Sequence, residues 1–92
     1  MGRISAHIKV EGMVQGVGYR AFTADTARAM GLSGWVRNLL DGSVEAILEG
    51  EEEQVQQAIT ACRTGPARAR VEHISIDISQ NGNEFRSFDI RY

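Results

Sequence analysis

The segment EGMVQGVGYRAF, residues 11–22, combines three glycines with one arginine. Gly12, Gly16 and Gly18 leave the backbone without side chains, and Arg20 stands two residues after the last of them. Successive N–H groups of such a loop can converge on an anion, and a following helix adds the partial positive charge of its N-terminus. The forked guanidinium of Arg20 would then bind two oxygens of the same anion. The segment therefore predicts a small phosphate-binding loop.

Two other interpretations of this loop are weaker. Residues 16–21 match G-x-G-x-x-A, which is typical of dinucleotide-binding folds. Asp41 lies close to the position at which such folds carry an acidic residue downstream of this motif. However, the chain is too short for two mononucleotide-binding halves, and the preceding strand alternates instead of being continuously apolar. A loop without any ligand is the second alternative. Under this alternative, the positive charge of Arg20 in the first helical turn would be unfavourable, because a cation there opposes the helix dipole. A bound anion would reverse this electrostatic penalty.

The elements that must position the loop follow from hydrophobic periodicity. Alternating apolar residues predict a strand over residues 4–10, with one buried and one wet face. A helix is expected after the loop, and Gly31 is a natural residue to end it. Four residues at helical spacing are expected to form its buried face: Phe22, Thr26, Ala29 and Met30.

The rest of the chain is expected to add a hairpin, a second helix and two further strands. Two β-capable runs around Asp41-Gly42 predict an antiparallel hairpin, and residues 51–53 begin a second helix that ends at Gly65-Pro66. Its buried stripe is expected to consist of Val55, Ala58, Ile59 and Cys62. A strand then places Ile74, Ile76 and Ile78 on one face, Asn81-Gly82 predicts a turn, and residues 85–92 can form a closing strand.

The resulting order, β-α-β-β-α-β with a short additional strand at the C-terminus, predicts the fold class. It is α+β: a ferredoxin-like sandwich with a mostly antiparallel sheet and two helices on one face. We expect residues 1–92 to form a single domain, because this length suffices for one core.

Two motifs give the chain a resemblance to a known family. GMVQGVGYR, residues 12–20, resembles the phosphate-loop motif of acylphosphatases, roughly G-x-V-Q-G-V-x-[FY]-R. GLSGWVRNLLDGSVEAILEG, residues 31–50, resembles that family's second signature, and GPARARVE and Tyr92 are also similar to the family pattern. The resemblance covers essentially the whole chain, with both motifs in the right order and spacing.

The resemblance implies an enzyme that hydrolyses the carboxyl–phosphate bond of acyl phosphates, with no metal and no other cofactor. By this resemblance Arg20 binds the phosphate and Asn38 orients the attacking water. The backbone amides that surround the phosphate would be those of Val14, Gln15, Gly16, Val17, Gly18 and Tyr19.

Three details of the resemblance concern single residues. Tyr19 replaces the commoner Phe, with little expected consequence if its hydroxyl reaches water. Leu39 stands where some relatives carry a hydroxyl, so its side chain has no group for an auxiliary hydrogen bond. Asn is depleted in strands, so a functional role would explain Asn38. The alternative is a residue at the end of a strand that leads into the Asp-Gly turn. Periodicity does not predict on which face of the strand Asn38 lies.

Other residue types that often carry catalysis are less suitable here. His7 and His73 are expected on the wet sides of their strands, Cys62 in the core, and Glu51–Glu53 at a solvated helix start. No His, Cys and carboxylate residues have the spacing of metal ligands.

The composition limits the partners. A net charge of −2 without a basic stripe argues against nucleic-acid binding. No segment has the apolar length of a signal peptide core or a membrane span, and the single cysteine indicates a reducing compartment. We therefore expect a cytoplasmic monomer that binds a small acyl phosphate, with inorganic phosphate or sulfate as competing anions.

Two alternatives share the fold. A binding module could sense a phosphorylated metabolite without useful turnover, or resemble the acylphosphatase-like domain of hydrogenase-maturation carbamoyltransferases. An RNA-recognition domain would need a basic, aromatic strand, whereas SVEAILEG is acidic and has no aromatic residue.

Overall fold

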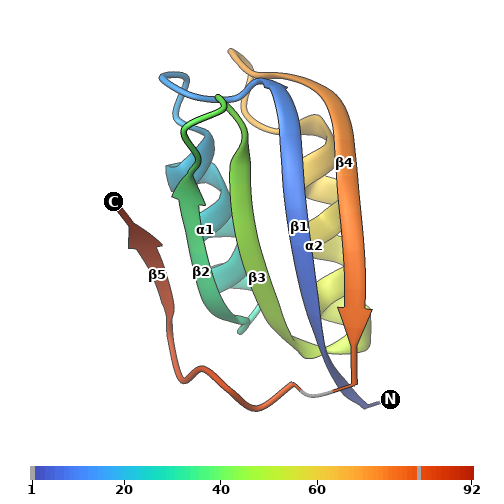
Figure 1. Ribbon diagram of the computed structural model, residues 1–92. Coiled ribbons are helices and arrows are strands. Elements are labelled where there is room, and N and C mark those ends of the chain that lie inside the picture. The colour runs from blue at the N-terminus through green and yellow to red at the C-terminus, as the bar shows by residue number, and fades with distance from the viewer. Residues whose placement is uncertain (1, 81) are drawn as a thin grey trace.

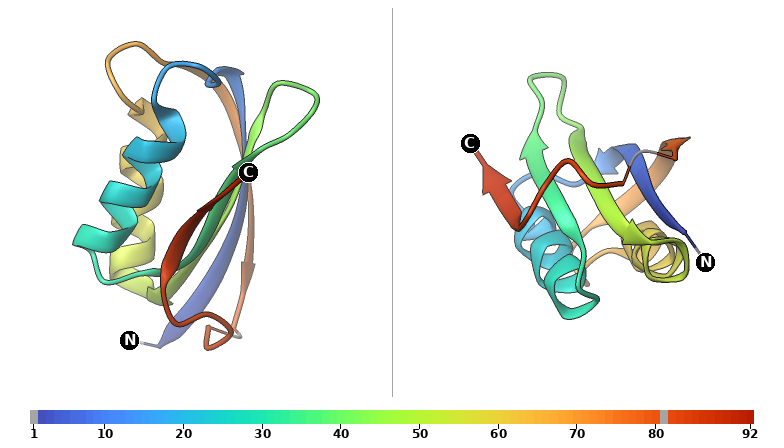
Figure 2. Two further views of the ribbon diagram at one scale, coloured as in Figure 1. Left: turned by 90° about the vertical axis from the view of Figure 1, so that its left-hand side faces the viewer. Right: turned by 90° about the horizontal axis from the view of Figure 1, so that it is seen from below.

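The computed structural model of the chain describes residues 2–80 and 82–92, and within them five strands form one sheet. The elements are β1 (Arg3–Met13), α1 (Tyr19–Ala29), β2 (Ser33–Asn38), β3 (Val44–Glu51), α2 (Glu52–Thr64), β4 (Arg70–Ser79) and β5 (Phe88–Arg91). The strand order is β4-β1-β3-β2-β5, with β5 parallel to β2 and all other pairs antiparallel. Both helices lie on the same face of the sheet (Figures 1 and 2). The predicted ferredoxin-like α+β architecture is confirmed.

The core lies between the sheet and the two helices. Four alternating residues of β1 are buried, as predicted: Ile4, Ala6, Ile8 and Val10. They lie opposite apolar residues of β3, so that Ala6 pairs with Leu48 and Ile8 with Ala46. The predicted stripe of α2 is also confirmed, since Val55, Ala58, Ile59 and Cys62 are all buried.

The buried face of α1 differs from the prediction. Its buried residues are Tyr19, Thr23, Ala24 and Ala27. Of the predicted residues, Phe22, Thr26 and Met30 are only half-buried, and Ala29 is exposed. The rotation of the helix is set by polar contacts at its ends, where Tyr19 donates to the Cys62 carbonyl and Arg28 donates twice to the Phe88 carbonyl. Small side chains therefore face the sheet. The end of the helix is as predicted, with Gly31 in a left-handed conformation at φ 72°.

The hairpin predicted at Asp41-Gly42 joins β2 and β3. One carboxylate oxygen of Asp41 accepts hydrogen bonds from the backbone N–H and the hydroxyl of Ser43, and the other lies 3.0 Å from Nζ of Lys9. These contacts, chiefly the bond from the Ser43 hydroxyl, hold the pKa of Asp41 well below its usual range. These contacts restrain the conformation of the turn that follows β2.

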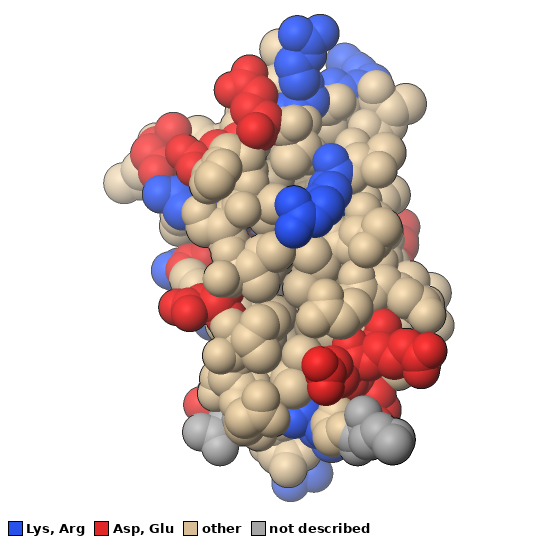
Figure 3. All heavy atoms as spheres, turned by 90° about the vertical axis from the view of Figure 1, so that its right-hand side faces the viewer, with Lys and Arg blue, Asp and Glu red and all other residues tan. Residues whose placement is uncertain are grey.

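Strand β4 forms one edge of the sheet. Its isoleucines share one face, as predicted, because Ile74, Ile76 and Ile78 lie opposite Val10, Ile8 and Ala6. Ile76 and Ile78 remain 37% and 44% exposed, since no strand lies beyond β4 in the described sheet. Figure 3 shows this side of the molecule, where uncharged side chains make up most of the surface. Of the turn predicted at Asn81-Gly82, Asn81 lies outside the described residues.

The chain after β4 crosses to the opposite edge of the sheet and ends in β5 (Figure 1). Glu49 is fully buried under this crossing, and its carboxylate accepts the N–H groups of Glu84 and Phe85, both at 3.0 Å. On the face away from the helices, the guanidinium carbons of Arg37 and Arg91 lie 5.1 and 4.8 Å from the ring centroid of Trp35. Both sets of contacts lie on the face of the sheet away from the helices, where they fix the crossing segment and β5.

Gly34 offers a test of this architecture. Its φ is 133°, and a methyl group there would overlap the Ile47 carbonyl oxygen in the neighbouring strand. Gly34→Ala should therefore lower the free energy of unfolding by roughly 3 kcal/mol or more in urea titrations. Gly31→Ala is the matched control, because its φ is 72° but nothing lies within 4 Å of the added methyl. It should cost only about 1 kcal/mol; equal losses would contradict this packing.

Candidate active site

The loop between β1 and α1 has the conformation that its glycines predict. Gly16 and Gly18 take left-handed φ values of 74° and 81°, and Gly18 caps α1 without any side-chain hydrogen bond. Within the described chain, the N–H groups of residues 15–18 have no hydrogen-bond acceptor. The first turn of α1 also contains no acidic residue. The loop therefore offers free donors and an unneutralised helix N-terminus, which together favour an anion.

Arg20 lies in the first helical turn, as predicted, and its side chain reaches towards the end of β5. One terminal nitrogen, Nη1, donates to the Arg91 carbonyl at 3.3 Å. The guanidinium carbon lies 4.7 Å from the centroid of the Tyr92 ring, a distance typical of a cation–π contact. The charge is therefore held above the loop without an ion-pair partner among the described residues.

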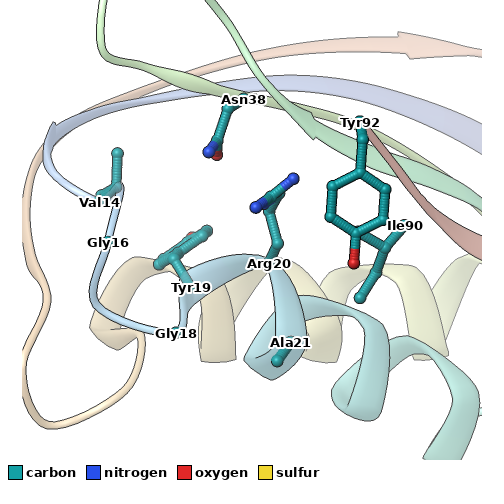
Figure 4. A pocket seen from close by; sticks show the side chains of 9 residues that line it. All are labelled: Val14, Gly16, Gly18, Tyr19, Arg20, Ala21, Asn38, Ile90 and Tyr92. Carbon is teal, nitrogen blue, oxygen red and sulfur yellow. The ribbon is translucent and has the colours of Figure 1, made fainter.

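Asn38 is the last residue of β2, and its side chain points into the same space as Arg20 (Figure 4). Its amide oxygen Oδ1 is buried and has no hydrogen-bond partner among the described residues. A buried polar atom of this kind normally binds a protein donor, a water or a ligand. Periodicity did not predict on which face of β2 Asn38 lies. In the structure its side chain lies on the face that borders this space.

These residues line one cavity of about 180 Å³. Its lining consists of Val14, Gly16, Gly18, Tyr19, Arg20, Ala21, Asn38, Ile90 and Tyr92 (Figure 4). The structure thus brings Arg20 and Asn38 together with most of the predicted loop, whereas Gln15 and Val17 do not line the cavity. Sequence reasoning assigned no role to Ala21 or Ile90. The alternation of Phe88, Ile90 and Tyr92 could have indicated a second wall.

Gln15 joins the loop to the hairpin that carries Asn38. Its side-chain nitrogen Nε2 donates to the carbonyls of Leu39 and Ser43, each at 2.8 Å. The backbone of Leu39 also contributes to the hairpin, since its N–H donates to the Ser43 carbonyl at 2.9 Å. One carboxamide therefore sets the separation of the loop and the end of β2, a role that the sequence did not reveal.

The hydroxyl of Tyr19 does not reach water, so the condition under which the sequence predicts little consequence of this residue is not met. The residue is 1% exposed, and its hydroxyl donates to the Cys62 carbonyl at 2.7 Å. Because α1 begins at Tyr19, the ring projects between the two helices rather than outwards. Burial raises the pKa of Tyr19 and also that of the Cys62 thiol. Both groups stay neutral at ordinary pH, so neither supplies a charge or a nucleophile.

The two histidines of the chain lie outside the cavity. His7 contacts Glu45 at 2.6 Å on the open face of the sheet, and His73 contacts the Ser75 hydroxyl at 3.2 Å on β4. Among residues 2–80 and 82–92, no group of three or more His, Cys, Asp or Glu side chains could hold a metal ion. In the same part of the chain, no helix has the length and apolar character needed to cross a membrane.

The fold places this chain among ferredoxin-like α+β proteins, and its cavity combines an arginine with a glycine loop at a helix N-terminus. The family model for acylphosphatases matches residues 6–90, and the chain belongs to the acylphosphatase family. It is an enzyme of that family.

Individual relatives agree with this assignment. The acylphosphatase of Rhodopseudomonas palustris is 54% identical over 80 residues, covering 87% of this chain and 81% of that protein. The acylphosphatase of Geobacter sulfurreducens is 42% identical over 98% of this chain and 99% of its own. The crystal structure of acylphosphatase from Bacillus subtilis superposes with a TM-score of 0.94 at 37% identity, covering 97% of this chain and 99% of that chain.

The bridge made by Gln15 can be tested without changing any group that lines the cavity. Gln15→Ala keeps the loop amides but removes both bonds to the hairpin, so kcat for acyl phosphate hydrolysis should fall about tenfold. The free energy of unfolding should fall by only about 1–2 kcal/mol. Gln57→Ala, an exposed position of α2, is the matched control and should change neither quantity. An unchanged kcat in Gln15→Ala would show that the bridge does not position the site.

Proposed function

We propose that this chain hydrolyses the carboxyl–phosphate bond of acyl phosphates to a carboxylate and inorganic phosphate without a metal ion. The observation that carries the proposal is that Arg20 and Asn38, from different elements, line one small cavity beside the glycine loop. A guanidinium, an amide and free backbone donors are the groups needed to bind a phosphoryl group and a water molecule together.

The phosphoryl group binds at the start of α1. Its oxygens accept hydrogen bonds from the backbone N–H groups of residues 14–19 and from the guanidinium of Arg20. The left-handed conformations at Gly16 and Gly18 support this assignment, because they turn a run of backbone amides without adding a side chain. The charges on the transferred phosphoryl group are thereby stabilised by donors that are already in place.

Asn38 orients the attacking water. Its buried oxygen Oδ1 has no partner in the described chain, so it is free to accept one hydrogen of that water. The water oxygen forms the new bond to phosphorus, while the bond from phosphorus to the acyl oxygen breaks and its electron pair leaves with the carboxylate. A proton of the water passes to the phosphate product or to solvent. Because a carboxylate is a weak base, its departure requires no general acid.

A module that only binds a phosphorylated metabolite is the alternative function. Such a module would need Arg20 and the loop but would not need an amide that orients water.

In the proposed function the chain acts as a cytoplasmic monomer, and residues 1–92 form one domain. Inorganic phosphate or sulfate competes with the substrate for Arg20 and the loop.

Arg20→Ala and Asn38→Ala test the two assignments directly. With benzoyl phosphate in buffer containing EDTA, each variant should lose at least about 10²–10³ in kcat/KM, the typical effect of removing one preorganised donor. Arg20→Ala should also weaken inhibition by inorganic phosphate, whereas Asn38→Ala should not. Arg68→Ala, an exposed position between α2 and β4, is the control for loss of charge. Full activity of either site variant, or loss of wild-type activity in EDTA, would refute the mechanism.

The pH dependence provides an independent test. An arginine remains protonated and an amide does not titrate between about pH 5 and 8, and Tyr19, whose pKa is raised by burial, stays neutral there. We therefore expect kcat to vary little over this range. The pH profile of His7→Gln should match that of the wild type. A steep bell-shaped profile centred near the ordinary pKa of histidine would mean that a general acid or base has been overlooked.

A further inference from the structure

Along β5 and the residue that follows it, the side chains that face the helices become steadily more exposed. Ile90 lies opposite Val36, which belongs to the core, so Phe88, Ile90 and Tyr92 point to the helix side of the sheet. Phe88 is 3% exposed, Ile90 is half-buried and Tyr92 is 99% exposed. The apolar surface of β5 thus runs from the core to the rim of the cavity.

The cavity consequently has two unlike sides (Figure 4). The β1–α1 loop forms one side and presents bare backbone at Gly16 and Gly18. Ala21, Ile90 and Tyr92 contribute the other side, which is apolar apart from the tyrosine hydroxyl. Arg20 lies between the two sides, with its guanidinium near the Tyr92 ring.

We propose that Ile90 and Tyr92 bind the acyl group of the substrate, so that the enzyme prefers acyl phosphates with an aromatic or bulky apolar acyl group. The inference rests on the proposed function, which assigns the phosphoryl group to the loop and Arg20. Because that group occupies the side rich in donors, the acyl group must lie towards the apolar side. There it covers apolar surface of Ile90 and the exposed ring of Tyr92.

The contact with Arg20 makes Tyr92 suitable for this role. The cation–π contact restrains a ring that otherwise lies in solvent, so less of its conformational freedom is lost when a substrate packs against it. A planar acyl group can stack on this ring in an offset arrangement, whereas an acetyl group offers only one methyl. Aromatic pairs of this kind contribute a factor of about two to twelve beyond their buried area.

The test compares benzoyl phosphate with acetyl phosphate on the same variants. The ratio of the two kcat/KM values, taken relative to that of the wild type, removes the difference in intrinsic reactivity between the two substrates. Tyr92→Ala should lower the ratio about tenfold, mainly through a higher KM for benzoyl phosphate, whereas Tyr92→Phe should retain it. Leu40→Ala is the matched control, because Leu40 is a fully exposed apolar residue of the hairpin that does not line the cavity.

The same measurements separate failure of this inference from failure of the proposed function. A folded wild type that hydrolyses neither substrate would refute the proposed function itself. Hydrolysis of both with an unchanged ratio in Tyr92→Ala would overturn the role of Tyr92 in acyl binding. A parallel loss for both substrates, with weaker inhibition by inorganic phosphate, would also overturn it, because Tyr92 would then act only by holding Arg20.

Discussion

The site depends on the separation of two loops at one end of the sheet, and the carboxamide of Gln15 sets that separation. The loop before α1 carries the backbone donors proposed to bind the phosphoryl group, and Asn38 lies where β2 enters the hairpin. Neither segment has a core of its own, and each would be mobile if it were joined only through its flanking strands. By donating to two hairpin carbonyls, Gln15 makes the two segments one polar unit. The locked turn at Asp41 stiffens the same unit from the other side.

Arg20, the proposed ligand of the phosphoryl group, is a flexible side chain that the fold restrains in advance. An arginine loses considerable rotamer freedom when it is fixed, and that loss weakens binding if it occurs together with ligand capture. Here the carbonyl of Arg91 and the ring of Tyr92 restrain the guanidinium in advance without neutralising its charge. The short parallel strand β5 thus connects the packing of the sheet to the electrostatics of the site.

The sequence predicts most of the fold because strand alternation, the Asp-Gly turn and the α2 stripe are local signals. It fails on the buried face of α1, where polar contacts of Tyr19 and Arg28 with distant carbonyls outweigh the preference of bulky residues for the interior. At the site, the glycine loop and Arg20 are visible in the sequence because they are contiguous. The alternation of Phe88, Ile90 and Tyr92 indicates a strand with an apolar face, but the location of that face beside the loop depends on the pairing of the last strand with β2, which is not a local signal.

The position of Trp35 has a consequence for spectroscopy. It is the single tryptophan of the chain, and the guanidinium of Arg91 lies over its ring. Arg91 belongs to β5, and its backbone carbonyl accepts the hydrogen bond from Arg20. We therefore expect the fluorescence of this indole to respond when the strand that restrains Arg20 separates from β2. One native side chain would thus follow the attachment of β5 without an added label.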